Sequence, residues 1–235
     1  MHATDPSVAR SRGRRLPRLA ACAALAVATS GVAAAQGSAA TIAVGSPCVV
    51  NANPAEGTPM AVAGADFTAG DTINVTSTTG DAFSTLPITV AADGTWTTIM
   101  PAPTLSTLGP GAQTFTLQAM DETDGVTTAT TTVAVANLAV AWSPAEAKPK
   151  KKVTWSFSGF TPGAPVYAHY LHRNKVIATA SFGHTSGPCG LLKKRAVFFP
   201  GHSKYSTYKM QIDDSHHYSA KALPRVLASL TTNLF

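Results

Sequence analysis

The stretch from Gln113 to Ala136 reads QTFTLQAMDETDGVTTATTTVAVA, and its pattern decides the fold class. Apolar and polar residues alternate through Phe115-Thr116-Leu117, as they do on a strand with one buried face and one wet face. Asp124-Gly125 is a turn dipeptide, and a second run rich in Thr and Val follows it. The stretch therefore predicts two strands joined by a hairpin turn.

The same pattern extends outward in both directions, because short runs rich in Val, Ile, Thr and Phe are broken repeatedly by Gly, Pro, Asp or Asn. No long helical period interrupts it, so the sequence predicts an all-β protein. The strands expected in the first half are Met60 to Ala65, Thr72 to Ser77, Leu86 to Val90, Thr95 to Met100, Gln113 to Met120 and Val126 to Ala136. Those expected in the second half are Val153 to Phe157, Val166 to Leu171, Lys175 to Phe182, Leu191 to Phe199 and Tyr208 to Asp213.

Composition and charge narrow the class further. The chain has 235 residues, of which 45% are hydrophobic and 13% charged, so it is too apolar for a disordered protein. The formal charge of +6 conceals three blocks. Residues 1–35 carry five Arg against Asp5, residues 36–147 carry nine carboxylates and no Lys or Arg, and residues 148–235 carry thirteen Lys and Arg against two Asp.

Residues 1–35 have the organisation of a cleaved secretory signal. Five arginines precede a 14-residue apolar stretch from Leu19 to Val32, and Ala33-Ala34-Ala35 supplies the small residues of a cleavage site. A span of the bilayer needs roughly 20 residues, so a membrane anchor is disfavoured. The Leu19-Ala20-Ala21-Cys22 run leaves lipidation as an alternative, and Arg14-Arg15 leaves the export route open. The mature chain is expected to begin near Gln36, with no transmembrane segment.

Only Cys48 and Cys189 remain once the leader is removed. An oxidising compartment favours a disulfide between them, and no other internal pairing exists. Two free thiols or an intermolecular bridge are the alternatives.

A short motif occurs twice in the mature chain. Phe67-Thr68-Ala69-Gly70 is followed by Ile73, and Phe160-Thr161-Pro162-Gly163 is followed by Val166, at an offset of 93 residues. With Asp93-Gly94-Thr95-Trp96, these motifs make residues 55 to 215 resemble the bacterial immunoglobulin-like repeats of secreted and cell-surface proteins. The resemblance implies tandem β-sandwiches that act as spacers, adhesive modules or wall-binding modules, and it supplies no catalytic residues.

The expected organisation follows from the charge blocks and this resemblance: two tandem immunoglobulin-like β-sandwich domains after a cleaved signal peptide. Ser143 to Lys152 has the Pro/Lys-rich composition of a linker, and Leu223 to Phe235 allows a docking helix, a final strand or a frayed tail. The divisions are 1–35 signal peptide, 36–54 lead segment, 55–142 acidic sandwich, 143–152 linker, 153–222 basic sandwich and 223–235 C-terminal tail.

The basic block contains six of the seven histidines and all five tyrosines. On a strand beginning at Val166, Tyr167, His169, Leu171 and Arg173 would share one face, with Ala168, Tyr170 and His172 on the other. His169 and His172 then point to opposite faces, which argues against a shared metal. We predict a ligand surface formed by Tyr167, His169, Arg173, Tyr170 and His172, because rings with hydrogen-bonding tips suit carbohydrate.

Two further segments allow other chemistry. Asp121-Glu122-Thr123-Asp124-Gly125 puts three carboxylates in one turn, and carboxylate oxygens are calcium ligands, although the segment matches a full calcium loop poorly. Phe182 to Gly190 contains Cys189 as a candidate nucleophile and His184 as its base. That segment resembles the Ser-x-Gly-Cys-x-Arg motif of exported L,D-transpeptidases, with departures at Pro188 and Leu191.

The sequence thus predicts an exported, non-catalytic, envelope-associated binding or structural module without cofactor or metal. Its contact surface lies on the basic second domain, and cell-wall polymer or carbohydrate is the expected partner. Nucleic acid is disfavoured, because the compartment is wrong and no nucleic-acid motif is present. The alternative is an envelope enzyme that uses Cys189 and His184. Two other interpretations of the opposite charges stay open. The two blocks attract each other, or the charges of each block only keep it soluble.

Overall fold

The structure is a computed structural model that describes residues 39–53, 57–79, 87–148, 150–200 and 206–232. These residues form fifteen strands and their connections. The expected all-β fold is confirmed for this part of the chain. Within the same ranges, no helix is long and apolar enough to cross a bilayer. The expected signal peptide lies outside the described residues.

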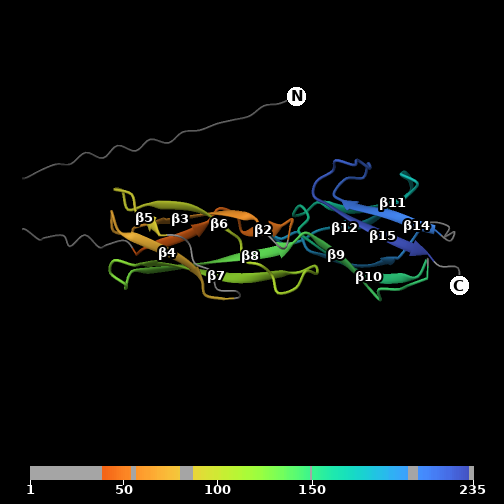
Figure 1. Ribbon diagram of the computed structural model, residues 1–235. Coiled ribbons are helices and arrows are strands. Elements are labelled where there is room, and N and C mark those ends of the chain that lie inside the picture. The colour runs from red at the N-terminus through yellow and green to blue at the C-terminus, as the bar shows by residue number, and fades with distance from the viewer. Residues whose placement is uncertain (1–38, 54–56, 80–86, 149, 201–205, 233–235) are drawn as a thin grey trace, which may run out of the picture. The chain divides into compact units, whose positions relative to one another are not determined.

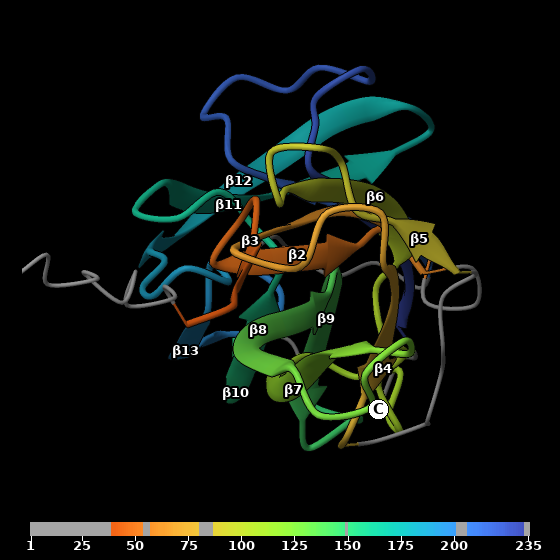
Figure 2. The ribbon, with the colours of Figure 1, turned by 90° about the vertical axis from the view of Figure 1, so that its left-hand side faces the viewer.

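The first eight strands form two facing sheets around one hydrophobic core (Figure 1). One sheet has the order β1-β3-β6 and the other the order β2-β8-β7-β4-β5. All pairings are antiparallel except that of β2 with β8. The close pairing of β3 with β6 and of β7 with β8 is visible in Figure 2. The bounds are β1 Thr41–Val44, β2 Cys48–Asn51, β3 Pro59–Ala65, β4 Thr72–Ser77, β5 Ile88–Thr89, β6 Trp96–Pro101, β7 Ala112–Asp121 and β8 Thr128–Asn137.

Alternation along the strands builds this first core, as the sequence predicts. Ile73 and Val75 of β4 and Phe115 of β7 have 0% exposed surface, whereas Asn74 and Thr76 are half-buried. Burial of one face of each sheet removes the branched and aromatic side chains from water, which is the main stabilising contribution.

The last seven strands form a second pair of sheets, with the orders β13-β10-β9 and β12-β11-β14-β15. Its core is aromatic: the ring centroids of Trp155 and Phe182 are 5.0 Å apart, and those of Phe157 and Phe182 are 4.8 Å apart. The bounds are β9 Ala139–Ser143, β10 Lys152–Ser158, β11 Pro165–His172, β12 Lys175–His184, β13 Leu192–Val197, β14 Ser206–Asp213 and β15 Arg225–Thr232. The structure therefore has two β-sandwich cores.

A covalent cross-link joins the strands of the two cores. The disulfide connects Cys48 of β2 to Cys189, between β12 and β13, across 141 residues of sequence. The expected intramolecular pairing is thus present. Leu138 alone separates the end of β8 from the start of β9, and the Gly159 N–H donates to the Cys189 carbonyl at 2.9 Å.

Several strands fall where the sequence predicts other structure. The segment expected as a lead, 36–54, contains β1 and β2, which pair with β3 and β8. The expected linker begins at the last residue of β9, so the connection to β10 is shorter than predicted. Of the three alternatives for the last residues, the strand is correct, because β15 pairs along the length of β14.

Candidate functional site

Four of the five predicted ligand residues lie on β11, but they do not form one exposed surface. Tyr167, His169 and Leu171 do face the outer side of the four-stranded sheet, opposite Asp213, Gln211 and Lys209 of β14. The same side continues onto β15, where these β14 residues pair with Arg225, Leu227 and Ser229. The outer face therefore consists of three rows of residues, and each row crosses β11, β14 and β15.

Arg173 does not belong to this face, which corrects the sequence prediction. His172 pairs with Lys175, and the two residues between them have positive φ, 49° at Arg173 and 62° at Asn174. Two left-handed residues make a type I′ hairpin turn. Arg173 is thus a turn residue beyond the end of the strand.

His169 is buried, with 0% exposed surface, so it cannot act as a surface ligand residue in this structure. Its Nε2 lies 3.0 Å from the Ser215 carbonyl oxygen and 3.4 Å from Asp213 Oδ1. Its Nδ1 lies 3.2 Å from Thr179 Oγ1. A carbonyl only accepts, so Nε2 carries the proton that is donated to Ser215.

Tyr170 and His172 point to the inner side of the sheet. Tyr170 is fully buried, its hydroxyl donates to the Phe198 carbonyl at 3.0 Å, and burial raises its pKa. His172 Nδ1 is 3.2 Å from Ser206 Oγ, and its ring centroid is 5.3 Å from that of Tyr208. Both residues therefore have packing roles.

The connection between β14 and β15, residues 214–224, is fastened to the outer face of the sheet; we call it the cover segment. Asp213 Oδ1 accepts from the Ser215 N–H at 2.8 Å, and Gln211 Nε2 donates to the Ser219 carbonyl at 2.7 Å. Gln211 Nε2 also donates to Asp213 Oδ2 at 2.6 Å. Ring contacts join Tyr218 to His169 and His216 to Tyr167, with centroids 5.7 and 5.3 Å apart. His169, Tyr167, His216 and Tyr218 thus hold the cover segment against the sheet.

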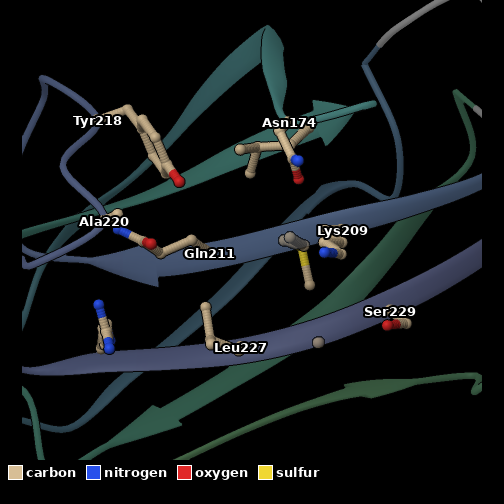
Figure 3. A pocket seen from close by; sticks show the side chains of 11 residues that line it. Asn174, Lys209, Gln211, Tyr218, Ala220, Leu227 and Ser229 are labelled. Atoms are coloured by element: carbon tan, nitrogen blue, oxygen red, sulfur yellow. The ribbon is translucent and has the colours of Figure 1, made fainter.

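A pocket of about 490 Å³ opens beside the cover segment, over β11, β14 and β15 (Figure 3). We call it the β14–β15 pocket. Tyr218 and Asn174 lie on one side of it, and the Tyr218 hydroxyl points inward toward the sheet. Lys209 and Gln211 on β14 and Leu227 and Ser229 on β15 form the opposite side. The complete lining is Leu171, Asn174, Lys209, Met210, Gln211, Tyr218, Ala220, Arg225, Leu227, Ala228 and Ser229.

The pocket is positively charged. Lys209 and Arg225 are its charged lining residues, and no carboxylate is among them. Asp213 is opposite Arg225 in register, yet its carboxylate oxygens accept from Ser215 and Gln211 and lie beside His169. Within the described ranges, neither cation has a carboxylate at ion-pair distance. The site can therefore offer two positive charges, hydroxyl and amide groups, and the apolar surface of Leu227, which is 67% exposed.

None of the pocket residues belongs to the predicted ligand set. The alternation Tyr208-Lys209-Met210-Gln211-Ile212-Asp213 marks a polar outer face on β14. Nothing comparable marks Tyr218, because its position depends on the buried contacts of the cover segment.

The candidate nucleophile is not a thiolate here. Cys189 Sγ is bonded to Cys48, and Cys189 has 2% exposed surface. His184 Nδ1 lies 3.0 Å from the Gly163 carbonyl oxygen. These contacts favour a structural role for both residues in the oxidised chain.

The carboxylates of the acidic hairpin turn mostly accept from their own turn and a neighbouring strand. The Thr127 hydroxyl donates to Asp124, as do the N–H groups of Thr127 and Val126 at 2.9 and 2.8 Å, and these bonds lower the pKa of the Asp124 carboxyl. Glu122 accepts from Asn74 Nδ2. Among the residues placed by the structure, no group of three or more His, Cys, Asp or Glu side chains is arranged to hold a metal.

Comparisons with known proteins add little to this geometry. No protein-family model and no curated protein matches the chain. Among solved structures, a tetra-tandem repeat from the extending region of a large adhesion protein aligns with 81% of this chain and 47% of its own, at 14% identity and TM-score 0.28. Salmonella alpha-2-macroglobulin, as a Y1175G mutant, aligns with 80% of this chain and 16% of its own, at 11% identity and TM-score 0.35.

A third structure is a Ca²⁺-stabilised adhesin that helps an Antarctic bacterium reach out and bind ice. It aligns with 82% of this chain and 47% of its own, at 16% identity and TM-score 0.31. This chain spans less than half the length of each of the three structures. Likenesses at these TM-scores carry no conclusion about activity or ligand. The described residues themselves define an all-β, disulfide-linked protein with a basic pocket.

Proposed function

We propose that this chain is an exported, non-catalytic, envelope-associated binding or structural module. Its contact surface is the second pair of sheets, and its partner is an envelope polymer or carbohydrate. The signal peptide at residues 1–35 and the bacterial immunoglobulin-like character of two tandem sandwiches are parts of this proposal.

The strand order supports the immunoglobulin-like part. With β1 to β8 lettered A, A′, B, C, C′, E, F and G, the sheets of the first core are A-B-E and A′-G-F-C-C′. With β9 to β15 lettered A, B, C, C′, E, F and G, those of the second are A-B-E and C′-C-F-G. Immunoglobulin-like sandwiches divide their strands between sheets in this manner.

The Cys48–Cys189 disulfide supports export, because disulfides persist in oxidising compartments. The observation that carries the binding role is the concentration of cationic side chains on the second pair of sheets. Lys193 and Arg195 of β13 are exposed, and Lys209 and Arg225 line the β14–β15 pocket. Such a surface attracts a polyanion in a salt-dependent way.

The test is co-sedimentation of the full mature chain with isolated cell walls. We expect retention at low salt, release at high salt, and competition by soluble polymer extracted from the same walls. A protein of similar size with a net negative charge is the negative control. The absence of retention at low salt, or retention that neither salt nor competitor reduces, would overturn the proposal.

A further inference from the structure

We propose that the β14–β15 pocket binds an anionic saccharide, a sugar chain that bears carboxylate or phosphate groups. This inference deepens the proposed function by naming the ligand class and the residues that bind it. The inference rests on that function only in naming the envelope as the source of the ligand. The chemical class of the ligand is argued from the pocket residues alone.

The charges of the pocket select an anion. Lys209 and Arg225 have no carboxylate beside them in the lining, and the nearby Asp213 is engaged by Gln211 and Ser215. Two unpaired cations on one face give it a positive potential, which favours an anionic group beside each of them. A guanidinium also binds a carboxylate or phosphate through two parallel hydrogen bonds.

The spacing of the cations selects an extended ligand. Arg225 and Ser229 are four residues apart on β15, and Lys209 is opposite Ser229. At roughly 3.3 Å per residue, the two cationic positions are separated by about 13 Å along the strand. A small ion would contact both only if the two long side chains converged on it, whereas an oligosaccharide with repeated acidic groups can reach each cation at its own strand position.

The rest of the lining suits sugar rather than a simple polyanion. Tyr218, which is 39% exposed, and Leu227 offer apolar surface to the C–H faces of a sugar ring. Asn174 and Ser229 supply amide and hydroxyl groups at the rim, and the Tyr218 hydroxyl points into the space between the two sides of the pocket. A volume of about 490 Å³ is within the range of small-ligand pockets.

The cover segment preorganises the site. Tyr218 and Ala220 belong to it, and hydrogen bonds from Gln211 to Ser219 and from His169 to Ser215 fasten it to the sheet. His169 is therefore a positioning residue, since it touches the ring of Tyr218 rather than the ligand. A ring held in place before binding loses less conformational entropy when the ligand arrives.

The experiment is titration calorimetry of the full mature chain with three probes: tetragalacturonate, phosphorylated maltotetraose and neutral maltotetraose. We expect at least one acidic tetramer to bind at least about tenfold more tightly than the neutral one, because a charge-assisted hydrogen bond is stronger than a neutral one. The carboxylate probe and the phosphate probe distinguish the two sources of negative charge. Galacturonate monomer should bind more weakly than its tetramer.

The decisive variant is Lys209→Gln/Arg225→Gln, which should reduce acidic-tetramer affinity at least about tenfold. The matched control, Lys150→Gln/Lys151→Gln, removes the same charge from two exposed residues of the β9–β10 connection and should leave the affinity within about twofold of the parent. Tyr218→Ala should weaken binding, and Tyr218→Phe should restore most of it. Circular dichroism melting verifies that each variant is folded.

The outcomes separate this inference from the proposed function. Equal binding of neutral and acidic tetramers, or equal losses in the two double variants, would overturn the pocket while wall retention could still hold. Acidic-tetramer binding that depends on Lys209 and Arg225, in a chain that isolated walls do not retain, would support the pocket and overturn the envelope role.

Discussion

At Asp213, a carboxylate with 0% exposed surface accepts from the Ser215 N–H and the Gln211 amide, and His169 lies beside it. Burial of an unpaired charge is very unfavourable, so these partners are required for the sheet to carry a carboxylate there. Gln211 and His169 also contact the cover segment, to which Ser215 itself belongs. The group that satisfies the buried charge therefore also fixes the wall of the pocket.

The surroundings of Asp71 disfavour the ionised form of its carboxyl group. Desolvation, followed by the negative charge of Asp121, raises the pKa of the Asp71 carboxyl. Folding thus strengthens proton binding, and ionisation of Asp71 destabilises the fold as pH rises through the raised pKa. We expect Asp71→Asn to raise the Tm at pH 7, and the gain to vanish below about pH 3.9, where the carboxyl is protonated in both states. Thermal melting across this pH range measures it.

Asp93→Asn is the matched control with the opposite sign. The Thr95 hydroxyl and N–H donate to Asp93 Oδ1 at 2.6 and 3.1 Å, and these bonds lower its pKa. This substitution should therefore lower the Tm at pH 7. A gain for Asp71→Asn that persists at low pH, or the same sign for both variants, would contradict the explanation.

At the scale of the elements, strands with strong local patterns could be predicted and those defined by distant partners could not. The prediction for β4, Thr72 to Ser77, matches the structure residue for residue. The strand β2 has only four residues, and its partner β8 lies some 86 positions away in sequence. The local sequence of β2 therefore gives little indication that it forms a strand. The leucines of β15 were also consistent with a helix, and pairing with β14 decided the outcome.

In the candidate site too, features set by local alternation could be predicted and features set by distant segments could not. The outward positions of Tyr167 and His169 follow from alternation on β11 and are confirmed by its register with β14. The burial of His169 could not be predicted, because the cover segment lies more than 40 residues away in sequence. Arg173 was misplaced because its turn residues, Arg-Asn, lack the glycine that usually marks a type I′ turn.

The two sandwiches share a close contact between a glycine and a phenylalanine backbone. Phe67 precedes β4 and Phe160 precedes β11, and in each case a glycine backbone lies against the Phe backbone. A Cβ at Gly94 would be 2.9 Å from the Phe67 oxygen, and a Cβ at Gly190 would be 1.7 Å from the Phe160 oxygen. The two motifs that echo at the sequence level are thus the same turn contact in both cores.

Gly190→Ala should consequently be among the most destabilising single-methyl changes in the second core. Its φ of 57° costs about 1–2 kcal/mol for an L-residue, and the clash with Phe160 adds about 1–3 kcal/mol of overpacking. Gly187→Ala is the matched control, since its φ is 67° but nothing lies within 4 Å of the added Cβ. Urea unfolding measures both. Equal losses of unfolding free energy would refute the close approach.

At the scale of the whole molecule, the disulfide connects the strands of two hydrophobic cores that consist of different residues. Cys48 and Cys189 cluster with Ala136, and the partly buried Val50, Ala134 and Leu191 pack around them. The cross-link spans 141 residues and includes most strands of both cores. Its effect should therefore be seen in the stability of the entire chain.

The last prediction concerns this cross-link and is measured in two steps. Intact mass after thiol blocking should show no blocked cysteine in the secreted monomer and two after reduction, and the same spectrum gives the mature N-terminus. In the chain-entropy model, a loop of 141 residues stabilises the fold by up to about 5 kcal/mol. Cys48→Ala/Cys189→Ala should therefore lower the denaturation midpoint by an amount that matches reduction of the parent chain. A midpoint unaffected by either change would contradict the prediction and would mean that the fold is stable without the bridge.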